Sequence, residues 1–368
     1  MSAGRQAIRF TTGADGVRLA YAVSGNGPPL VKTPTWITHL EYDWKSPVSR
    51  HWLAELNRQH ALVRYDARGS GLSDWEVEDI SFEKWVGDLE TVVDAAGLRR
   101  FALTGTSQGA AVAIAFAARH PERVSRLVLW GGFCRGMLRR NGGPALVEKA
   151  QMFVKLAEMG WGTEDPAFVQ VFTSQFIPGG TAEQWRWFSE KMRISTSPHN
   201  AVRFMRAVYE IDVCDLARQV RCPTLVVHSR RDARIPYEEG KLTAALIPGA
   251  EFLTLESANH VVLEDEPAWA HLVDELRRFL ALPDEPGLTG AGEHQHERFG
   301  GLSERERQVC ELVAQGLGNE EISQRLFLSP KTVRNHITSI FAKTGVSSRA
   351  QAIVLAREAG FGHSSRSA

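Results

Sequence analysis

The stretch Phe101-Ala-Leu-Thr-Gly105-Thr-Ser107-Gln-Gly109-Ala-Ala-Val-Ala-Ile organises the rest of the chain. It opens with an apolar run typical of a buried strand, breaks at a G-x-S-x-G sequence, and continues as an alanine-rich run typical of a helix. Small residues at both ends of the break permit a strained turn in which the backbone passes close to itself. The pattern predicts a strand, a sharp turn and a helix, with the Ser107 hydroxyl beside a helix N-terminus that favours negative charge. The alternative is an ordinary glycine-rich turn with a solvated serine.

Composition narrows the class of protein. A chain of 368 residues is long enough for two or three domains. Its formal net charge of zero gives no overall electrostatic attraction to nucleic acid or to a membrane surface. The four cysteines form no C-x-x-C pair, and His294 and His296 in a polar tract are interpreted as solvated, so we expect no metal and no cofactor. Without a signal-like start or an apolar run of about 18 residues, a cytoplasmic protein with no membrane contact is expected.

Strand-like and helix-like runs alternate through residues 1–281, which predicts an α/β domain with a parallel sheet. A hairpin is expected at residues 7–11 and 17–23. Further strands are expected at residues 30–33, 61–65, 101–103, 124–130, 222–228 and 251–255, and helices at residues 51–59, 82–96, 238–246 and 266–281.

Residues of about 136–205 differ from their surroundings, because they are helical in pattern and rich in aromatic side chains. We interpret them as an inserted lid over a cleft that suits an apolar or mixed small molecule. The alternative is a helical subdomain in which the aromatics form their own core. The side chains expected to line the ligand pocket are Trp36, Trp130, Phe153, Trp161 and Trp185.

A serine nucleophile needs a base, and the base needs an orienting carboxylate. In a fold of this order the acid and then the histidine should follow the serine, each at the carboxyl end of a strand. Asp232 follows the strand at 222–228, and His260 follows the strand at 251–255. We predict a catalytic triad of Ser107, Asp232 and His260, although each partner alone could be an ordinary loop residue.

Oxyanion donors are expected on the backbone. One is the N–H of Gln108, which follows the nucleophile, and the other is the N–H of Trp36 in the loop after the strand at 30–33.

These motifs, with Tyr65-Asp-Ala-Arg-Gly-Ser-Gly-Leu-Ser-Asp74, make residues 1–281 resemble the α/β-hydrolase fold superfamily. The resemblance implies the fold and not the activity, since hydrolases, haloperoxidases, lyases and non-catalytic hormone receptors share it. Many members carry His-Gly where this chain has Pro34-Thr35. Thr35 lacks the backbone freedom of glycine, so the oxyanion hole could differ in shape from that of those members. Weak catalysis, and ligand binding without catalysis, are both compatible with such a site.

Residues 282–299 are polar, with two prolines and repeated glycines, and are interpreted as a flexible linker. Residues 300–368 then read as a small all-α domain, in which the pattern of caps and apolar residues places three helices. The first helix opens with a capping box of Ser303 and Glu306 and ends at Gly316, and a short second helix covers 320–326.

The third helix of this domain, expected at 330–343, has one apolar and one polar face. Its apolar side chains are Val333, Ile337, Ile340 and Phe341, and its polar ones are Lys331, Arg334, Asn335, Thr338 and Lys343. A tight turn between two helices, the second polar and basic outside, predicts a helix-turn-helix. Nine basic against six acidic residues give this segment a modest positive charge for phosphates. The alternative is a helical hairpin that contacts protein.

The segment strongly resembles the LuxR-type (NarL/FixJ-like) DNA-binding domain, through its Leu-Ser-x-Arg-Glu start, Gly316, Ser-Pro-Lys-Thr-Val-Arg-x-His and a fourth helix at 348–358. By resemblance, Arg334, Asn335 and Thr338 would face bases. Phosphates would be held by Lys331, Thr332 and Lys343. The fourth helix usually pairs two copies.

Together these features predict a transcriptional regulator that binds double-stranded DNA as a homodimer. Its hydrolase-like domain would bind a small-molecule signal that is apolar or resembles an ester or lactone. Both binding alone and binding with slow hydrolysis fit this prediction. No acidic phospho-receiver pattern precedes the helix-turn-helix, so a ligand fits better than phosphorylation. The alternatives are a serine hydrolase or esterase with an accessory DNA-binding module, and a hydrolase fold used only as a dimerisation scaffold.

Overall fold

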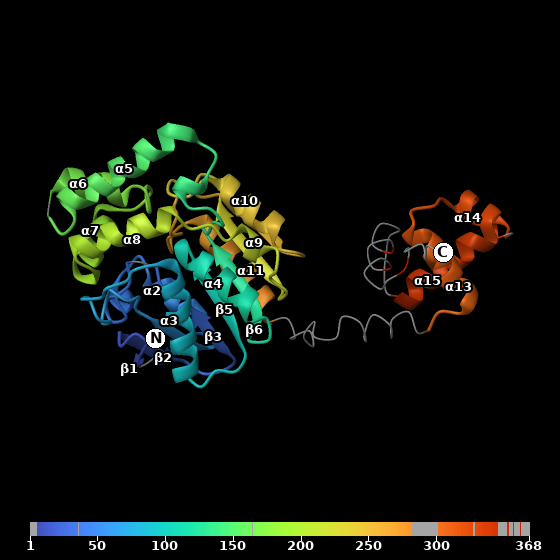
Figure 1. Ribbon diagram of the computed structural model, residues 1–368, viewed down its shortest axis with the longest axis horizontal. Helices are drawn as coiled ribbons and strands as arrows, with labels where there is room; N and C mark the ends of the chain where they lie inside the picture. Colours follow the sequence, from blue (N-terminus) through green and yellow to red (C-terminus); the bar gives the residue numbers. More distant parts are fainter. Residues whose placement is uncertain are drawn as a thin grey trace. The chain divides into compact units, whose positions relative to one another are not determined.

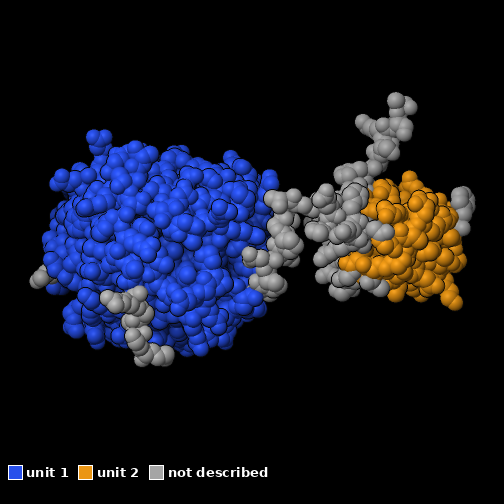
Figure 2. Space-filling view, turned by 90° about the horizontal axis from the view of Figure 1, so that it is seen from below, with its two compact units in different colours: residues 1–286 blue, residues 287–368 orange. Residues whose placement is uncertain are grey.

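The computed structural model describes residues 6–35, 37–163, 165–281, 301–326 and 328–344, together with residues 352, 356 and 361. The chain forms two compact units, Met1–Pro286 and Gly287–Ala368, which Figure 2 shows in different colours. Each unit has hydrophobic clusters of its own. Among the helices in the described part of the chain, none is long and apolar enough to cross a membrane.

The first unit is built on a sheet of eight strands in the order β1-β2-β4-β3-β5-β6-β7-β8. β1 pairs antiparallel with β2, as the predicted hairpin requires, and β2 pairs antiparallel with β4; every other pairing is parallel. The predicted α/β fold is confirmed. The strands are β1 (Ala7–Thr12), β2 (Arg18–Ser24), β3 (Pro29–Lys32), β4 (Ala61–Tyr65), β5 (Phe101–Thr106), β6 (Val124–Trp130), β7 (Thr224–Ser229) and β8 (Glu251–Leu255).

Helices cover both faces of the sheet, because alternate residues of the buried strands point to opposite sides. Leu103 of β5 belongs to one cluster, while Ala102 belongs to the other. The first face packs against α3 (Phe82–Ala95), α4 (Gln108–Arg119), α9 (Cys214–Ala217) and α10 (Tyr237–Leu246). The opposite face packs against α2 (Arg50–Leu56) and α11 (Pro267–Ala281), and a short helix that the sequence did not predict, α1 (Tyr42–Lys45), follows β3.

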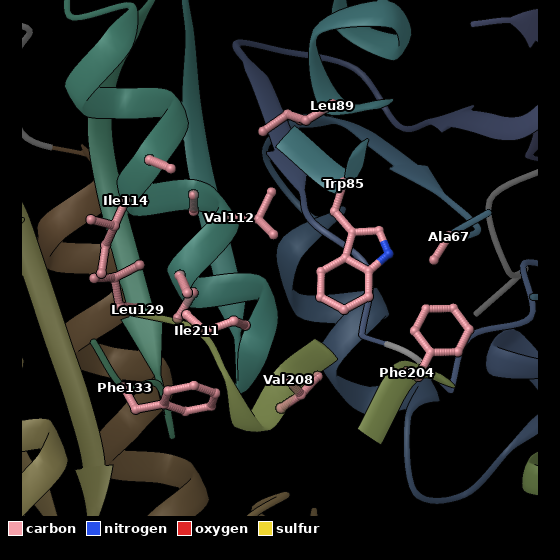
Figure 3. Packing of buried hydrophobic residues seen from close by; sticks show 14 of the residues in the cluster. Ala67, Trp85, Leu89, Val112, Ile114, Leu129, Phe133, Phe204, Val208 and Ile211 are labelled. Atoms are coloured by element: carbon pink, nitrogen blue, oxygen red, sulfur yellow. The ribbon is translucent and has the colours of Figure 1, made fainter. Parts of the chain in front are cut away.

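Helix α4 lies at the centre of the larger cluster, and its residues from Gln108 to Ala117 are all buried. Most of them are glycine or alanine, so the helix can approach the sheet closely. Figure 3 shows Val112 of α4 pointing toward Trp85, and Ile114 next to Leu129 of β6. The ring of Trp85 stacks on Phe204, with centroids 5.6 Å apart.

Four longer helices and one 3₁₀ turn are inserted between β6 and β7, where the sequence predicted a lid, and they gather together in Figure 1. Phe172 contacts both Trp161 and Phe168 inside this group. At least part of the aromatic content therefore forms a core of the insertion itself. The elements are η1 (Met137–Arg139), α5 (Gly143–Gly160), α6 (Pro166–Thr173), α7 (Ala182–Ser195) and α8 (Pro198–Tyr209).

The second unit contains α13 (Glu304–Ala314), α14 (Asn319–Leu326) and α15 (Pro330–Thr344). Their apolar faces meet in one cluster that includes Val309, Ile322 and Val333. The chain leaves α13 through Gly316, whose φ of +89° lies in the left-handed region that favours glycine. The predicted linker 282–299 lies outside the described residues, as does the predicted fourth helix 348–358 apart from residues 352 and 356.

The close approach of α4 to the loop after β3 makes glycine necessary at position 109. A Cβ there would lie 2.6 Å from Thr33 Oγ1 and 2.7 Å from Pro34 O. We expect Gly109→Ala to lower the free energy of unfolding of the first unit by about 2 kcal/mol through overpacking. Urea unfolding followed by tryptophan fluorescence measures this, since all ten tryptophans precede residue 282.

Gly87 in α3 is the matched control, because a Cβ there would meet nothing within 4 Å. Gly87→Ala should be neutral, or stabilising by up to about 1 kcal/mol, since alanine favours a helix interior. Equal effects of the two substitutions would contradict the argument from close approach.

Candidate functional site

Ser107 sits at the turn between β5 and α4 with φ 54° and ψ −128°, and among the described residues it is the only non-glycine with a positive φ. Such a conformation costs on the order of 1–3 kcal/mol and persists only where the surrounding structure enforces it. Here the enforcement is steric and polar: a Cβ at Gly105 would lie 2.6 Å from Gly109 O, and the Ser107 N–H donates to Trp130 O at 3.2 Å. The predicted sharp turn is therefore present.

Asp232 and His260 are in direct contact. His260 Nδ1 lies 2.7 Å from Asp232 Oδ2, while Asp232 Oδ1 accepts the N–H groups of Arg234 and Ile235 at 2.8 and 2.9 Å. Burial alone would raise the pKa of Asp232, but its interactions with His260 and His228 and the hydrogen bond from the Ile235 N–H hold it below its usual value. The carboxylate therefore stays ionised and fixes the orientation of the imidazole ring.

The segment Trp130-Gly131 lies between the serine and this pair. The Trp130 carbonyl accepts the Ser107 N–H, and a Cβ on Gly131, which has φ +54°, would come within 2.8 Å of His260 Cε1. His260 Nε2 is buried and has no hydrogen-bond partner in the part of the chain that the structure describes. That nitrogen is available to take a proton from a hydroxyl group or to bind a polar ligand atom.

The histidine loop is held by groups that the sequence did not reveal. The His260 N–H donates to Phe176 O at 2.8 Å, in the segment between α6 and α7. The neighbouring Asn259 accepts the Gly179 N–H at 2.9 Å and donates to Glu266 Oε1 at 2.7 Å. The insertion thus helps to position the histidine. No motif signals the contacts with Phe176 and Gly179, because each joins segments far apart in the sequence.

One of the two predicted oxyanion donors can be placed. Gln108 is the first residue of α4, so its N–H has no acceptor within the helix and lies at the positive end of the helix dipole. Trp36 lies outside the described residues. Beside it, the Thr35 hydroxyl donates to Ile37 O at 3.2 Å, while the Thr33 hydroxyl donates to Gly109 O at 2.9 Å and ties the loop to α4.

The four other residues predicted to line a ligand pocket all make packing contacts within the protein. Trp130 stacks on Trp52 at 4.3 Å, on the α2 and α11 side of the sheet. Trp161 and Trp185 donate their indole N–H groups to backbone carbonyls, and Phe153 is 8% exposed with Arg234 over its ring. Their contact with a ligand remains a prediction, as does that of Trp36.

In the second unit, α15 presents the predicted polar face to solvent. Five of the six predicted DNA-contacting side chains are exposed, and Thr332 is half-buried against Ser329; the exposed ones are Lys331, Arg334, Asn335, Thr338 and Lys343. The Thr338 hydroxyl donates to Arg334 O at 3.0 Å, which fixes its rotamer. Their contacts with bases and phosphates remain predictions.

Glu306 joins the first and third helices of this unit. It completes the capping box by accepting the Ser303 N–H at 2.7 Å, and it also accepts from Lys343 Nζ at 2.7 Å and the Ser339 hydroxyl at 2.6 Å. The ammonium of Lys343, followed by the other donors, lowers the pKa of Glu306 to about 2.

Comparison with known proteins agrees with this geometry. Residues 28–267 match the family model described as alpha/beta hydrolase fold, so the chain belongs to the α/β-hydrolase fold family. Residues 301–356 match the model of bacterial regulatory proteins of the luxR family. The predicted fusion of a hydrolase-fold domain with a LuxR-type helix-turn-helix is confirmed, and such a module implies binding to DNA.

Individual relatives match one part or the other. Pyrrolizixenacetamide deacetylase of Xenorhabdus hominickii is 24% identical over 283 residues, which cover 73% of this chain and 97% of that protein. A Mycobacterium bovis protein described as an HTH-type transcriptional regulator is 44% identical over 66 residues, or 17% of this chain and 8% of its own. The crystal structure of a hydrolase from Pseudomonas aeruginosa matches with 25% identity and a TM-score of 0.62, covering 75% of this chain and 98% of that one.

The ion pair of Glu306 generates a prediction about pH. A carboxylate whose pKa is lowered by folding contributes stability above its ordinary pKa of 4.5, and this is lost as the pH falls toward about 2. We expect Glu306→Gln to speed amide hydrogen exchange in α13 and α15 of the full chain at neutral pH. The difference from wild type, corrected for intrinsic rates, should vanish as the pH falls through that window. A difference that does not depend on pH would contradict this role of the charge.

Proposed function

We propose that the protein is a one-component transcriptional regulator in which the hydrolase-fold domain binds a small molecule and the helix-turn-helix binds double-stranded DNA. The observation that carries the proposal is the fusion of two parts in one chain. One is a hydrolase-fold domain with Ser107 at a strained turn between a strand and a helix, and the other is a module whose third helix exposes a polar and basic face. A metabolic enzyme has no evident need for such a module, whereas a sensor needs both parts.

The ligand class follows from the groups around Ser107. A carbonyl oxygen can accept the N–H of Gln108 at the start of α4, while the Ser107 hydroxyl and His260 Nε2 face the carbonyl carbon and its substituent. Esters, lactones and amides have this chemistry. These groups can hold such a ligand whether or not the bond is cleaved, so binding and slow turnover are compatible.

Turnover, where it occurs, would follow the serine-hydrolase sequence of steps. Ser107 Oγ attacks the carbonyl carbon and its proton passes to His260 Nε2. Asp232, which is held ionised, stabilises the imidazolium that results. The oxyanion accepts the Gln108 N–H, and the imidazolium returns its proton to the leaving group, which departs and leaves the acyl group on Ser107 Oγ. A water molecule that gives its proton to His260 Nε2 then attacks this ester, and the acid is released as Ser107 regains its proton. Slow cleavage of the signal would reset the regulator.

On DNA, α15 would enter the major groove, as the second helix of a helix-turn-helix does. The exposed Arg334, Asn335 and Thr338 would then face base edges, and Lys331 and Lys343 would meet phosphates. Thr332 lies in the first turn of α15, where its N–H bonds to Ser329 Oγ, and would assist at the helix N-terminus. A homodimer would place two such helices on a two-part operator.

A second candidate is a serine hydrolase with an accessory DNA-binding module. It is favoured by the direct contact of Asp232 with His260 and by a relative of nearly full hydrolase-domain length that is named a deacetylase.

Ser107→Ala separates the two candidates. We expect wild-type hydrolysis of p-nitrophenyl esters to be slow and to disappear in this variant, because the nucleophile is lost, while binding to promoter DNA is retained. Spectrophotometric ester assays and gel-shift assays on the same preparations measure both.

Ser174→Ala is the matched control, since the Ser174 hydroxyl bonds only to Val171 O in the contacts that the structure describes. It should change neither readout. Rapid, specific turnover by the wild type, with DNA binding indifferent to any ester tried, would favour the enzyme instead.

Arg334→Ala tests the proposed reading helix. Removing an arginine that contacts a base should weaken binding to the specific operator by about 1–3 kcal/mol and relax its sequence preference. Fluorescence anisotropy with specific and scrambled duplexes at fixed salt measures both effects. Arg186→Ala, an exposed arginine of α7 in the other unit, controls for the loss of one positive charge. Unchanged operator affinity in Arg334→Ala would overturn the assignment.

A further inference from the structure

Exposed apolar side chains gather on two of the inserted helices. In the part of the chain that the structure describes, six large hydrophobic side chains are exposed, and four of them belong to α5 and α6. These four are Val147, Met152, Met159 and Val171. Met152 is 54% exposed and Met159 is 72% exposed, so both side chains stand largely in solvent. Single apolar side chains on a surface are ordinary, whereas a group of them on neighbouring helices indicates a contact surface.

Helix α5 has two distinct sides, and in Figure 1 it lies on the side of the insertion away from α3. Its buried residues recur at helical spacing and are Ala150, Phe153, Ala157 and Gly160. A second row, which we call the outer row, follows steps of three and four residues and consists of Ala145, Glu148, Met152, Lys155 and Met159. All five members are exposed. With 3.6 residues per turn, the outer row lies about 140° around the helix from the buried residues.

A groove between α5 and α8 adjoins the outer row. It has a volume of about 550 Å³, and its apolar lining includes Leu138, Val147 and Val154. Exposed charged side chains also line it, and these are Lys155, Glu158, Arg206 and Glu210. Ridges of side chains on one helix pack into grooves on another. A ridge beside a groove can therefore be filled by a second copy of the same surface.

The charges of the outer row are complementary to a second α5 that runs antiparallel. Glu148 and Lys155 lie at equal distances, about 5 Å along the helix axis, from the point midway between residues 151 and 152. A two-fold axis through that point places Glu148 of each copy opposite Lys155 of the other, with Met152 of both copies beside the axis.

The existing contacts of these two residues leave them able to pair in this way. Glu148 makes no ion pair with any other described residue. Lys155 lies 3.4 Å from Glu158 in an exposed pair, which contributes little to stability and is easily exchanged.

We propose that the outer row of α5 and the adjoining groove form the contact surface of a homodimer, in which two α5 helices pack antiparallel around a two-fold axis. The inference deepens the homodimer of the proposed function and rests on that function for two copies acting together. The charge pattern supports a second copy as the partner, because one negative and one positive residue placed symmetrically about a point complement their own image.

The size of the surface sets the strength of the contact. Helix α5 has 18 residues, which makes it about 27 Å long, and two helix diameters make the surface about 20 Å wide. Such a strip buries roughly 500 Å² on each copy, or roughly 1,000 Å² in total, which is near the lower limit for a specific complex. We therefore expect a reversible dimer with a dissociation constant in the micromolar range.

Sedimentation velocity of the purified full chain, from about 1 to about 100 μM and without DNA, measures this equilibrium. We expect the wild type to pass from monomer to dimer over this range. Met152→Lys should weaken the dimer by roughly tenfold or more, because two ammonium groups would meet at the axis. Phe10→Lys is the matched control, since Phe10 is 53% exposed on β1, outside the insertion. It should leave the dissociation constant unchanged.

An exchange of charges tests the antiparallel arrangement. Glu148→Lys and Lys155→Glu should each weaken the dimer, because each substitution places like charges opposite one another. The variant that carries both changes should recover a dissociation constant close to that of the wild type, since its ion pairs are only reversed. Both side chains are exposed, so these substitutions leave the packing of the insertion intact.

The proposal is overturned if the wild type remains monomeric at about 100 μM, or if Met152→Lys dimerises as the wild type does. The second result would mean that the contact lies elsewhere, or that another part of the chain covers α5. Failure of the double variant to recover also overturns it. Anisotropy with promoter DNA on the same preparations tests the proposed function separately. DNA binding without a dimer through α5 would refute this inference alone, and a dimer through α5 without DNA binding would refute the function alone.

Discussion

The close approach of α4 to the end of β5 is the constraint on which the first unit depends. The chain reverses within the turn at Ser107, and this residue holds a positive φ that residues other than glycine rarely adopt. Glycines at 105 and 109 remove the side chains that would collide with backbone. The same turn carries Ser107 and begins α4, whose first N–H has no acceptor within the helix. The packing requirement and the chemistry of the site are therefore met by the same residues.

Features set by residues close together in the chain, and by the order of the strands, could be predicted from the sequence. The glycine spacing around Ser107 predicted the turn, and the capping box and Pro330 predicted where helices of the second unit begin. The chain order of Ser107, Asp232 and His260 placed them at the ends of β5, β7 and β8, because parallel strands bring their carboxyl ends to one edge. The boundaries of most predicted helices and strands differ from the observed ones by a few residues.

Long-range contacts could not be predicted in this way. The carbonyl of Phe176 accepts the N–H of His260, and the N–H of Gly179 bonds to the Asn259 side chain, yet nothing in the sequence around His260 marks either partner. The aromatic side chains of the insertion carried the same ambiguity. A tryptophan that lines a pocket and one that packs in a core have the same residue type and neighbours, as Trp161 with its contact to Phe172 illustrates. Burial and hydrogen bonding, which separate the two roles, appear only in the folded chain.

The internal ion pair of Lys343 has a consequence for the thermodynamics of DNA association. A free lysine that meets a phosphate contributes to affinity partly by displacing the counterions condensed on the duplex, which makes binding salt-dependent. Lys343 is already partly neutralised by Glu306 within the module. A phosphate that binds Lys343 must share this lysine with Glu306 or displace the Glu306 carboxylate. The entropy gained when counterions leave the DNA is therefore partly offset by the loss of this internal ion pair. The helix-turn-helix would therefore show a shallower salt dependence than its number of exposed cations suggests, with sequence reading carrying a larger share of the affinity.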